Sequence, residues 1–311
     1  MARKLRIQFE GAIYHVINRG NYRRNLFDSA GAIQAFEGCV FEAFERFKWR
    51  LHGFSVMINH YHLVLETPVT NLPEGMQWLQ STYATRFNRF RREKGHIFQG
   101  RYKALLVEPG PSLARVINYA HLNPVMAGSV TAENVANYRW SSLHYFINGP
   151  RPSFLVCIDW LRELGLEDAP EGWRAYLKYL EKFANDKKGR IAQDFDAMNC
   201  GWAIGTDGWR QALAKGYRHL TLTGVADAPA VVELKRLQWS EALDSALRQT
   251  GRRRSDLADD RKGAPWKIDI AEIMRNSTSA TNAWLAHELH MGAPSSVRQY
   301  LSDRRRGVSQ R

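Results

Sequence analysis

The order of two kinds of hydrophobic repeat constrains the fold of this 311-residue chain more than any other feature of its sequence. Apolar and polar side chains alternate in residues 11–19, 49–68 and 96–107, as they do in half-buried β-strands, and the middle segment is long enough for two strands. Residues 29–47 and 72–94 instead repeat apolar side chains every three or four positions, which predicts one buried helical face. The resulting order is strand, helix, strand, strand, helix, strand, that of a ferredoxin-like antiparallel sheet, so we predict an α+β fold.

Local signals refine the expected elements. The second helix should end at Gly95, and its apolar stripe predicts that Phe90 points inward. A Pro-Gly-Pro sequence at residues 109–111 breaks the fourth strand before a further helix. This helix should begin near Ser112 and end before Pro124.

The sequence changes in texture beyond residue 149 and becomes mostly helical in pattern. We predict a sheet domain over residues 1–150, a helical accessory region over 151–225 and a helical C-terminal region over 226–311. Residues 284–301 resemble a helix-turn-helix, although His290 stands where the turn usually carries glycine. Both DNA binding and plain helical packing fit this last region.

The charge balance favours a polyanionic partner. The chain has 44 Lys and Arg residues against 31 Asp and Glu residues, which gives a formal net charge of +13. Nucleic acid is the leading candidate, and a basic enzyme without such a partner is the alternative. Three dispersed cysteines show no metal-ligand spacing, and no segment has the pattern of an export signal or a membrane span. We expect a cytoplasmic, nucleoid-associated protein that does not bind membranes.

The candidate catalytic and metal-binding residues lie in a His-Tyr-His triplet and in one later helix. His60 and His62 are two residues apart on a predicted strand, so they share a face and can share a metal ion. Tyr119 and Asn123 are four residues apart on the helix that follows residue 112, so they project from one edge of it. Taken alone, the histidine pair and Tyr119 each fit ordinary packing better than a functional role.

The set of donors suits a particular class of metal ion. Two neutral imidazoles and one amide oxygen leave coordination positions open for phosphate oxygens and water, as Mg²⁺ or Mn²⁺ requires. A closed structural zinc site would need a fourth protein ligand. A tyrosine beside such an ion could act as a nucleophile toward a phosphodiester.

Five ordered segments resemble the REP-associated tyrosine transposases, relatives of the IS200/IS605 single-strand transposases within the HUH endonucleases. The resemblance covers about residues 3–148 and continues more faintly beyond them. The segments are FEGAIYHVINRGN (9–21), INHYHLVLETP (58–68), GHIFQGRYKALLVE (95–108), YAHLNPVMAG (119–128) and YRWSS (138–142).

This resemblance implies metal-dependent cleavage and rejoining of single-stranded DNA beside a hairpin, through a covalent 5′-phosphotyrosine. It identifies Tyr119 as the nucleophile, and His60, His62 and Asn123 as the metal ligands. Many relatives have glutamine at the position of Asn123, so the shorter amide is expected to reach the metal directly or through water. Tyr61 should face away from the metal.

Eight cations are candidates for contact with DNA, since Arg and Lys neutralise phosphates. One group surrounds the first strand and the other lies on the second helix and fourth strand: Arg3, Arg6, Arg19 and Arg23, then Arg86, Arg89, Arg101 and Lys103. Tyr22 and Tyr102 are candidate platforms for base stacking, with core packing equally open for Tyr102.

Two other functions remain possible at this point. A domesticated regulator would bind hairpin DNA without cleaving it, although it would not need Tyr119, His60 and His62 together. A metal-dependent RNA or nucleotide enzyme on the same sheet would prefer substrates with a 2′-hydroxyl. We expect a monomer, with a dimer as the alternative.

Overall fold

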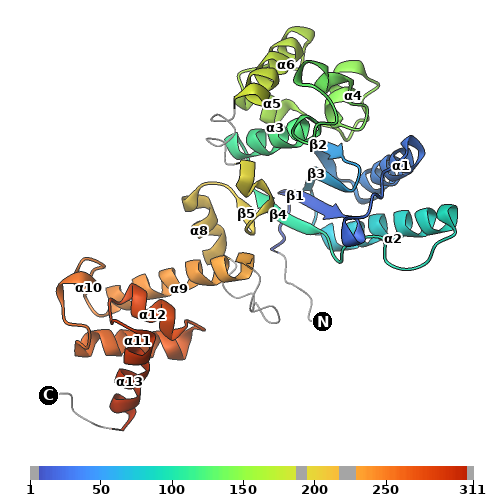
Figure 1. Cartoon of the computed structure of the whole chain (residues 1–311). Helices are drawn as coiled ribbons and strands as arrows, with labels where there is room; N and C mark the ends of the chain where they lie inside the picture. The colour runs from blue at the N-terminus through green and yellow to red at the C-terminus, as the bar shows by residue number, and fades with distance from the viewer. Residues whose placement is uncertain (1–6, 187–194, 217–228, 307–311) are drawn as a thin grey trace. The chain divides into compact units, whose positions relative to one another are not determined.

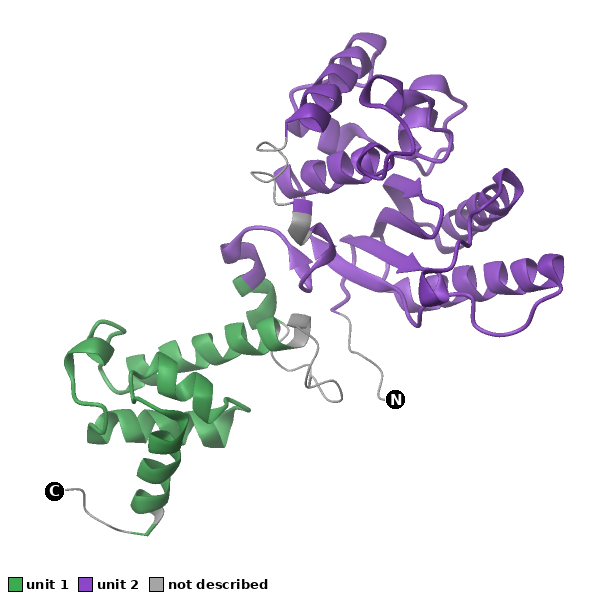
Figure 2. Cartoon of the chain, in the orientation of Figure 1, with its two compact units in different colours: residues 1–5, 211–311 green, residues 6–210 purple. Residues whose placement is uncertain are grey.

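The computed structural model describes residues 7–186, 195–216 and 229–306 (Figure 1). The chain divides into two compact units, one within residues 6–210 and the other within residues 211–311 (Figure 2). The three-part division at residues 150 and 225 stays a prediction.

The first unit is built on a five-stranded sheet with the order β2-β3-β1-β4-β5. Its first four strands are antiparallel: β1 (Ala12–Arg19), β2 (Arg50–Val56), β3 (His60–Thr67) and β4 (Lys103–Val107). This order is the ferredoxin-like one, and the predicted α+β fold is confirmed. The fifth strand, β5 (Ala203–Ile204), pairs in parallel with β4 and makes the whole sheet mixed.

Helices cover both faces of the sheet. α1 (Ala30–Phe47) and α2 (Leu72–Arg91) pack together on one face, where Tyr61 of β3 contacts Phe36 of α1. Ser29 is the N-cap of α1, because its side chain accepts a hydrogen bond from the amide of Ala32. α3 (Pro111–Met126) packs on the other face, where Gly53 of β2 allows the side chain of Ile117 to approach.

Shorter elements complete the first unit. The chain between residues 132 and 185 contributes η2 (Ala132–Asn137), α4 (Ser142–Asn148), α5 (Ile158–Glu163) and α6 (Pro170–Asn185), and the remaining short elements are η1 (Asn21–Arg23) and η3 (Phe195–Asn199). α8 (Asp207–Gly216) begins in the first unit and ends in the second. α5, α6 and η2 all contact α3. The region after residue 150 therefore supports the helix that carries Tyr119.

Two predictions at the end of α2 are wrong. The helix ends at Arg91, with Arg92 in a left-handed conformation, rather than at Gly95. Phe90 is 83% exposed instead of buried. Tyr83, about two turns before Phe90, already contacts Phe27, a residue that precedes the start of α1. The last turn of α2 therefore extends past the end of α1, and no residue of α1 covers Phe90.

The fourth strand and the helix after it also differ from their predicted limits. β4 begins at Lys103 rather than at residue 96, because Gly100 turns the chain with a φ of +69°. α3 continues through Pro124 to Met126 instead of ending before the proline. Pro124 lies in the last turn of the helix and has no N–H to donate to the carbonyl four residues earlier, while its own carbonyl accepts a hydrogen bond from the amide of Ser129.

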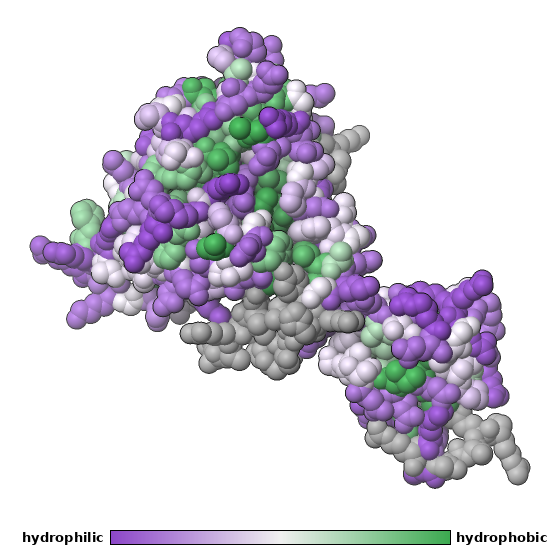
Figure 3. All heavy atoms as spheres, turned by 180° about the vertical axis from the view of Figure 1, so that it is seen from behind, coloured by the Kyte–Doolittle hydropathy of each residue, from purple (hydrophilic) through white to green (hydrophobic). Residues whose placement is uncertain are grey.

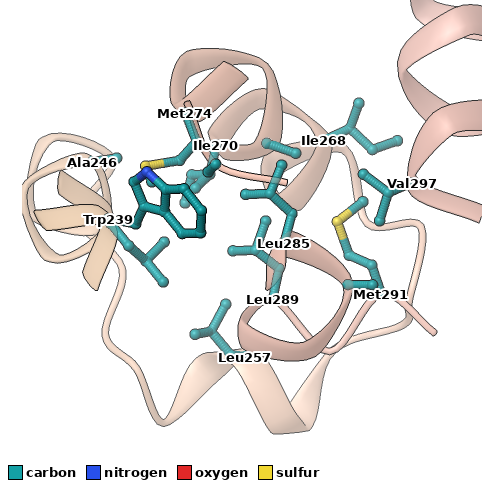
Figure 4. Packing of buried hydrophobic residues seen from close by; sticks show 14 of the residues in the cluster. Trp239, Ala246, Leu257, Ile268, Ile270, Met274, Leu285, Leu289, Met291 and Val297 are labelled. Atoms are coloured by element: carbon teal, nitrogen blue, oxygen red, sulfur yellow. The ribbon is translucent and has the colours of Figure 1, made fainter. Parts of the chain in front are cut away.

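The second unit is helical throughout its described residues. It contains α9 (Pro229–Gln249), α10 (Asp256–Asp259), α11 (Pro265–Ser277), α12 (Asn282–Glu288) and α13 (Pro294–Arg305). Figure 4 shows its apolar core, in which Trp239, Met274 and Leu285 lie among buried aliphatic side chains. His290, between α12 and α13, has a φ of +52°, the left-handed conformation that makes glycine usual at this turn position.

The surface is mainly hydrophilic on the side that Figure 3 shows, with small apolar areas in each unit. Within the described residues, no helix combines the length and the apolar character that crossing a membrane requires.

Candidate active site

β3 presents its two histidines on the face of the sheet that α3 covers. His60 and His62 have ring centroids 5.1 Å apart and nearly perpendicular planes. Tyr61 lies between them in sequence but points to the opposite face, where its hydroxyl accepts a hydrogen bond of 3.1 Å from the Gln80 side chain. Burial also raises the pKa of Tyr61, which keeps its phenol protonated. The expectation that Tyr61 faces away from the candidate metal site is confirmed.

α3 brings its tyrosine and asparagine to the same place. The ring of Tyr119 lies with its centroid 5.4 Å from that of His62, at an interplanar angle of 88°. The amide nitrogen of Asn123 donates to the backbone carbonyl of Tyr119 at 3.3 Å, and the Asn123 side chain lies beside His60. The structure therefore brings together Tyr119, His60, His62 and Asn123.

Both histidines are in the form that binds metals. Burial lowers the pKa of His60, and it lowers the pKa of His62 well below its ordinary value, so both rings are neutral near pH 7. The Nδ1 atom of His60 lies 2.8 Å from the side-chain oxygen of Asn59, which accepts a hydrogen bond from it, so the proton is on Nδ1 and the lone pair is on Nε2. The Nε2 atom of His62 is buried and has no hydrogen-bond partner within the described residues.

These donors fit a divalent cation. Two neutral imidazole nitrogens and an amide oxygen could hold a divalent cation, and such a ligand would satisfy the buried Nε2 atom of His62. Among the described residues, no group of three His, Cys, Asp or Glu side chains could hold a metal ion, so the amide of Asn123 has no acidic replacement.

Sequence reasoning missed a third histidine. His15 of β1 is fully buried, and its Nε2 atom lies 2.9 Å from the Nδ1 atom of His62. The β1–β3 register pairs His15 with Val64, so His15 and His62 are diagonal neighbours on one face. The alternation in residues 11–19 places His15 on one strand face, but only the pairing register brings it to His62.

A distant segment also reaches the site. Phe195 of η3 contacts the Tyr119 ring edge-on, and the Asn199 side chain donates a hydrogen bond to the Tyr119 hydroxyl. The carbonyl of Met198 lies 3.0 Å from the Nδ1 atom of His15. With these neighbours, Tyr119 is only 7% exposed. No motif in the sequence analysis pointed to residues 195–199.

His121 of α3 lies outside this group. Its two ring nitrogens are each 2.8 Å from a hydroxyl, one of Tyr176 in α6 and one of Ser142 in α4. Burial lowers the pKa of His121 to about 3. The residue joins α3 to the accessory helices rather than to the candidate metal site.

Residues 8–123 match the family model described as transposase IS200 like. We call these residues the transposase domain after the family model that they match. The matched segment contains β1 to β4 and extends along α3 to Asn123, so the transposase domain includes the three histidines and Tyr119.

Two solved structures are similar to parts of the chain. A REP-associated tyrosine transposase bound to a REP hairpin is 17% identical and covers 51% of this chain and 91% of its own, with a TM-score of 0.41. A protein of Deinococcus radiodurans R1 assigned as a transposase is 19% identical and covers 35% of this chain and 85% of its own, with a TM-score of 0.28. No curated protein matches the chain.

The cations predicted to contact DNA have different environments in the transposase domain. Arg3 and Arg6 lie outside the described residues. Exposed side chains with no ion pair within the described residues are those of Arg19, Arg23, Arg89 and Arg101. Arg86 instead forms a two-pronged pair with Glu42, at 2.9 and 2.8 Å, and Lys103 donates to the carbonyl of Asn199. DNA contact by these eight residues stays a prediction.

The two aromatic candidates for base stacking also differ. Tyr22 is 93% exposed and free to present a ring face, whereas Tyr102 is buried. The structure therefore favours core packing for Tyr102 and leaves stacking open for Tyr22.

Proposed function

We propose that the transposase domain cleaves and rejoins single-stranded DNA beside a hairpin, with Tyr119 as the nucleophile and Mg²⁺ or Mn²⁺ as the cofactor. One observation carries the proposal: the Tyr119 ring contacts His62, a neutral histidine whose buried Nε2 atom has no partner within the described residues. Most buried polar atoms are hydrogen-bonded, so an unpartnered Nε2 atom next to the Tyr119 ring supports a ligand at this point.

The side chains divide the chemistry among them. His60, His62 and Asn123 would hold the divalent ion, which would withdraw charge from the scissile phosphate. The Tyr119 oxygen forms a bond to phosphorus as its proton leaves, the bond from phosphorus to the 3′ oxygen breaks, and that oxygen takes up a proton. The product is a 5′-phosphotyrosine and a free 3′ hydroxyl, and attack by a 3′ hydroxyl reverses the step.

The setting of the site supports a monomer acting on nucleic acid. All four proposed site residues belong to one chain and are already in contact, so a second chain is not needed to complete them. The net charge of +13 supports a polyanionic substrate and a location at the nucleoid in the cytoplasm.

A covalent adduct tests the proposal. The full chain is incubated with single-stranded DNA hairpins and with matched RNA hairpins, in Mn²⁺, Mg²⁺ or EDTA, and digested with trypsin. We expect a nucleotide on the peptide of residues 116–139, which contains Tyr119, with DNA and metal only. Tyr119→Phe should abolish the adduct and retain hairpin binding, whereas the control Tyr61→Phe should keep it.

Each other result selects a different function. An adduct that survives in Tyr119→Phe would remove Tyr119 as the nucleophile. Hairpin binding without any adduct, with or without metal, would identify a non-catalytic regulator. A preference for RNA would indicate an enzyme that recognises the 2′-hydroxyl.

A further inference from the structure

A continuous chain of hydrogen bonds connects the backbone of η3 to His62. The carbonyl oxygen of Met198 lies 3.0 Å from Nδ1 of His15, and Nε2 of His15 lies 2.9 Å from Nδ1 of His62. Both imidazoles are fully buried. The two rings have an interplanar angle of 24° and centroids 5.1 Å apart, and the centroid of the Tyr119 ring lies 5.9 Å from that of His15.

The chemistry of the three groups sets the direction of these bonds. A carbonyl oxygen can only accept a hydrogen bond, so Nδ1 of His15 carries a proton. A neutral imidazole has one protonated nitrogen, so Nε2 of His15 has a lone pair and accepts a hydrogen bond from Nδ1 of His62. His62 is then protonated at Nδ1, and its lone pair is on Nε2, the buried atom with no partner within the described residues.

We propose that His15 is a positioning residue that holds His62 in the Nδ1-protonated tautomer and so directs the Nε2 lone pair of His62 toward the candidate metal site. Both rings are fully buried, an environment that favours the neutral form of an imidazole. Histidines that bind metals commonly have the second ring nitrogen fixed by such a partner. Here the partner is another histidine, oriented in turn by the backbone of residue 198.

This inference deepens the proposed function, because a fixed lone pair on His62 has a use only if His62 binds a ligand. The segment of residues 195–199 thereby acquires a defined role at the site. Its contribution is the backbone carbonyl of Met198, which sets the proton positions of the His15 and His62 rings.

The first test measures the tautomer without metal, DNA or activity. The full chain is labelled with ¹⁵N-histidine, and two- and three-bond ¹H–¹⁵N correlations are recorded, with His62 assigned by comparison with His62→Gln. The wild-type chain should show His62 protonated at Nδ1. His15→Phe keeps a ring but removes both nitrogens, and it should convert His62 largely to the Nε2-protonated tautomer or to a mixture.

Two further variants separate positioning from loss of packing. His15→Gln places an acceptor oxygen where Nε2 stood and should restore the wild-type tautomer of His62. His121→Phe removes another fully buried histidine that has two hydrogen bonds, and it should leave the His62 spectrum unchanged. If His15→Phe does not fold, the wild-type and His15→Gln spectra still decide the tautomer.

The second test measures metal affinity by Mn²⁺ titration followed through water-proton relaxation. His15→Phe should weaken Mn²⁺ binding by about 10–100-fold, the usual effect of losing the partner of a metal-binding histidine, and His15→Gln should recover most of it. A wild-type His62 protonated at Nε2, or equal Mn²⁺ affinity in His15→Phe and wild type, would overturn the inference. Absence of specific Mn²⁺ binding by the wild-type chain would overturn the proposed function and with it the purpose assigned to His15, even where the tautomer is the expected one.

Discussion

Tyr61 and His62 are neighbours in β3, but their side chains face opposite layers, and burial shifts their pKa values in opposite directions. Tyr61 lies among the aromatic rings of Phe27 and Phe36, where burial raises its pKa and removes it from consideration as a nucleophile. His62 lies against Tyr119 and His15, where burial lowers its pKa and keeps its lone pair available. The alternation of side chains along the strand predicted that the two residues face opposite sides. The helices that cover each side, α1 and α2 for Tyr61 and α3 for His62, decided the surroundings of each residue.

Arginine side chains that already have an ion-pair partner in the protein should contribute less to DNA binding than those without one. Arg19 is exposed next to His60, its partner in the β1–β3 register, and no ion pair neutralises it within the described residues. Arg19→Ala should weaken binding of a labelled single-stranded hairpin and reduce the slope of log affinity against log salt by about 0.7, the value for one phosphate contact.

Arg86 provides the matched control for that measurement, because Glu42 already neutralises its guanidinium. Arg86→Ala should leave the salt slope nearly unchanged when binding is followed by fluorescence anisotropy over a series of salt concentrations. Equal losses for the two variants would show that contact with Glu42 does not keep Arg86 from DNA.

At the scale of elements, the layer of α1 and α2 depends on one close approach. Gly75 of α2 lies against the indole of Trp49, and a Cβ at this position would lie 2.2 Å from Cζ2. The indole cannot easily move, since it is fully buried and its N–H donates to Asn71 at 2.6 Å. Hydrophobic periodicity identified α2 but carried no information on this contact.

Gly75→Ala should therefore destabilise the transposase domain by about 1–3 kcal/mol, the usual cost of overpacking. Gly38→Ala in α1 is the control, because no atom outside its own helix lies within 4 Å of the new Cβ, and it should stabilise the domain by about 0.5–1 kcal/mol. Amide hydrogen exchange of β1–β4 peptides measures both changes. Equal effects of the two substitutions would mean that Trp49 yields to the added methyl group.

At the scale of the whole molecule, the chain has two units with separate cores. The second unit contains Lys267, whose fully buried ammonium donates to the carbonyls of Leu257 and Asp260 at 2.8 and 2.9 Å. Burial lowers the pKa of Lys267. The side chain thereby connects α10 and the residue after it to the first turn of α11.

Lys267→Met should destabilise the second unit by about 1–3 kcal/mol, because both carbonyls lose their charged donor. Hydrogen exchange should increase in peptides of α10 and α11, while the β1–β4 peptides and the yield of the Tyr119 adduct stay at wild-type levels. Lys262→Met removes the same charge from an exposed position and should change neither. A fall in adduct yield with Lys267→Met alone would show that the two units are energetically coupled.

The sequence by itself determined the strand and helix order, the shared face of His60 and His62, and the common edge of Tyr119 and Asn123. These features follow from local side-chain periods, two residues in a strand and 3.6 residues in a helix, which a sequence shows directly. Only the tertiary structure decided that His15 meets His62, that residues 195–199 cover Tyr119 and that Phe90 is exposed. Strand register and the return of a distant segment depend on contacts between residues far apart in sequence, which no local period encodes.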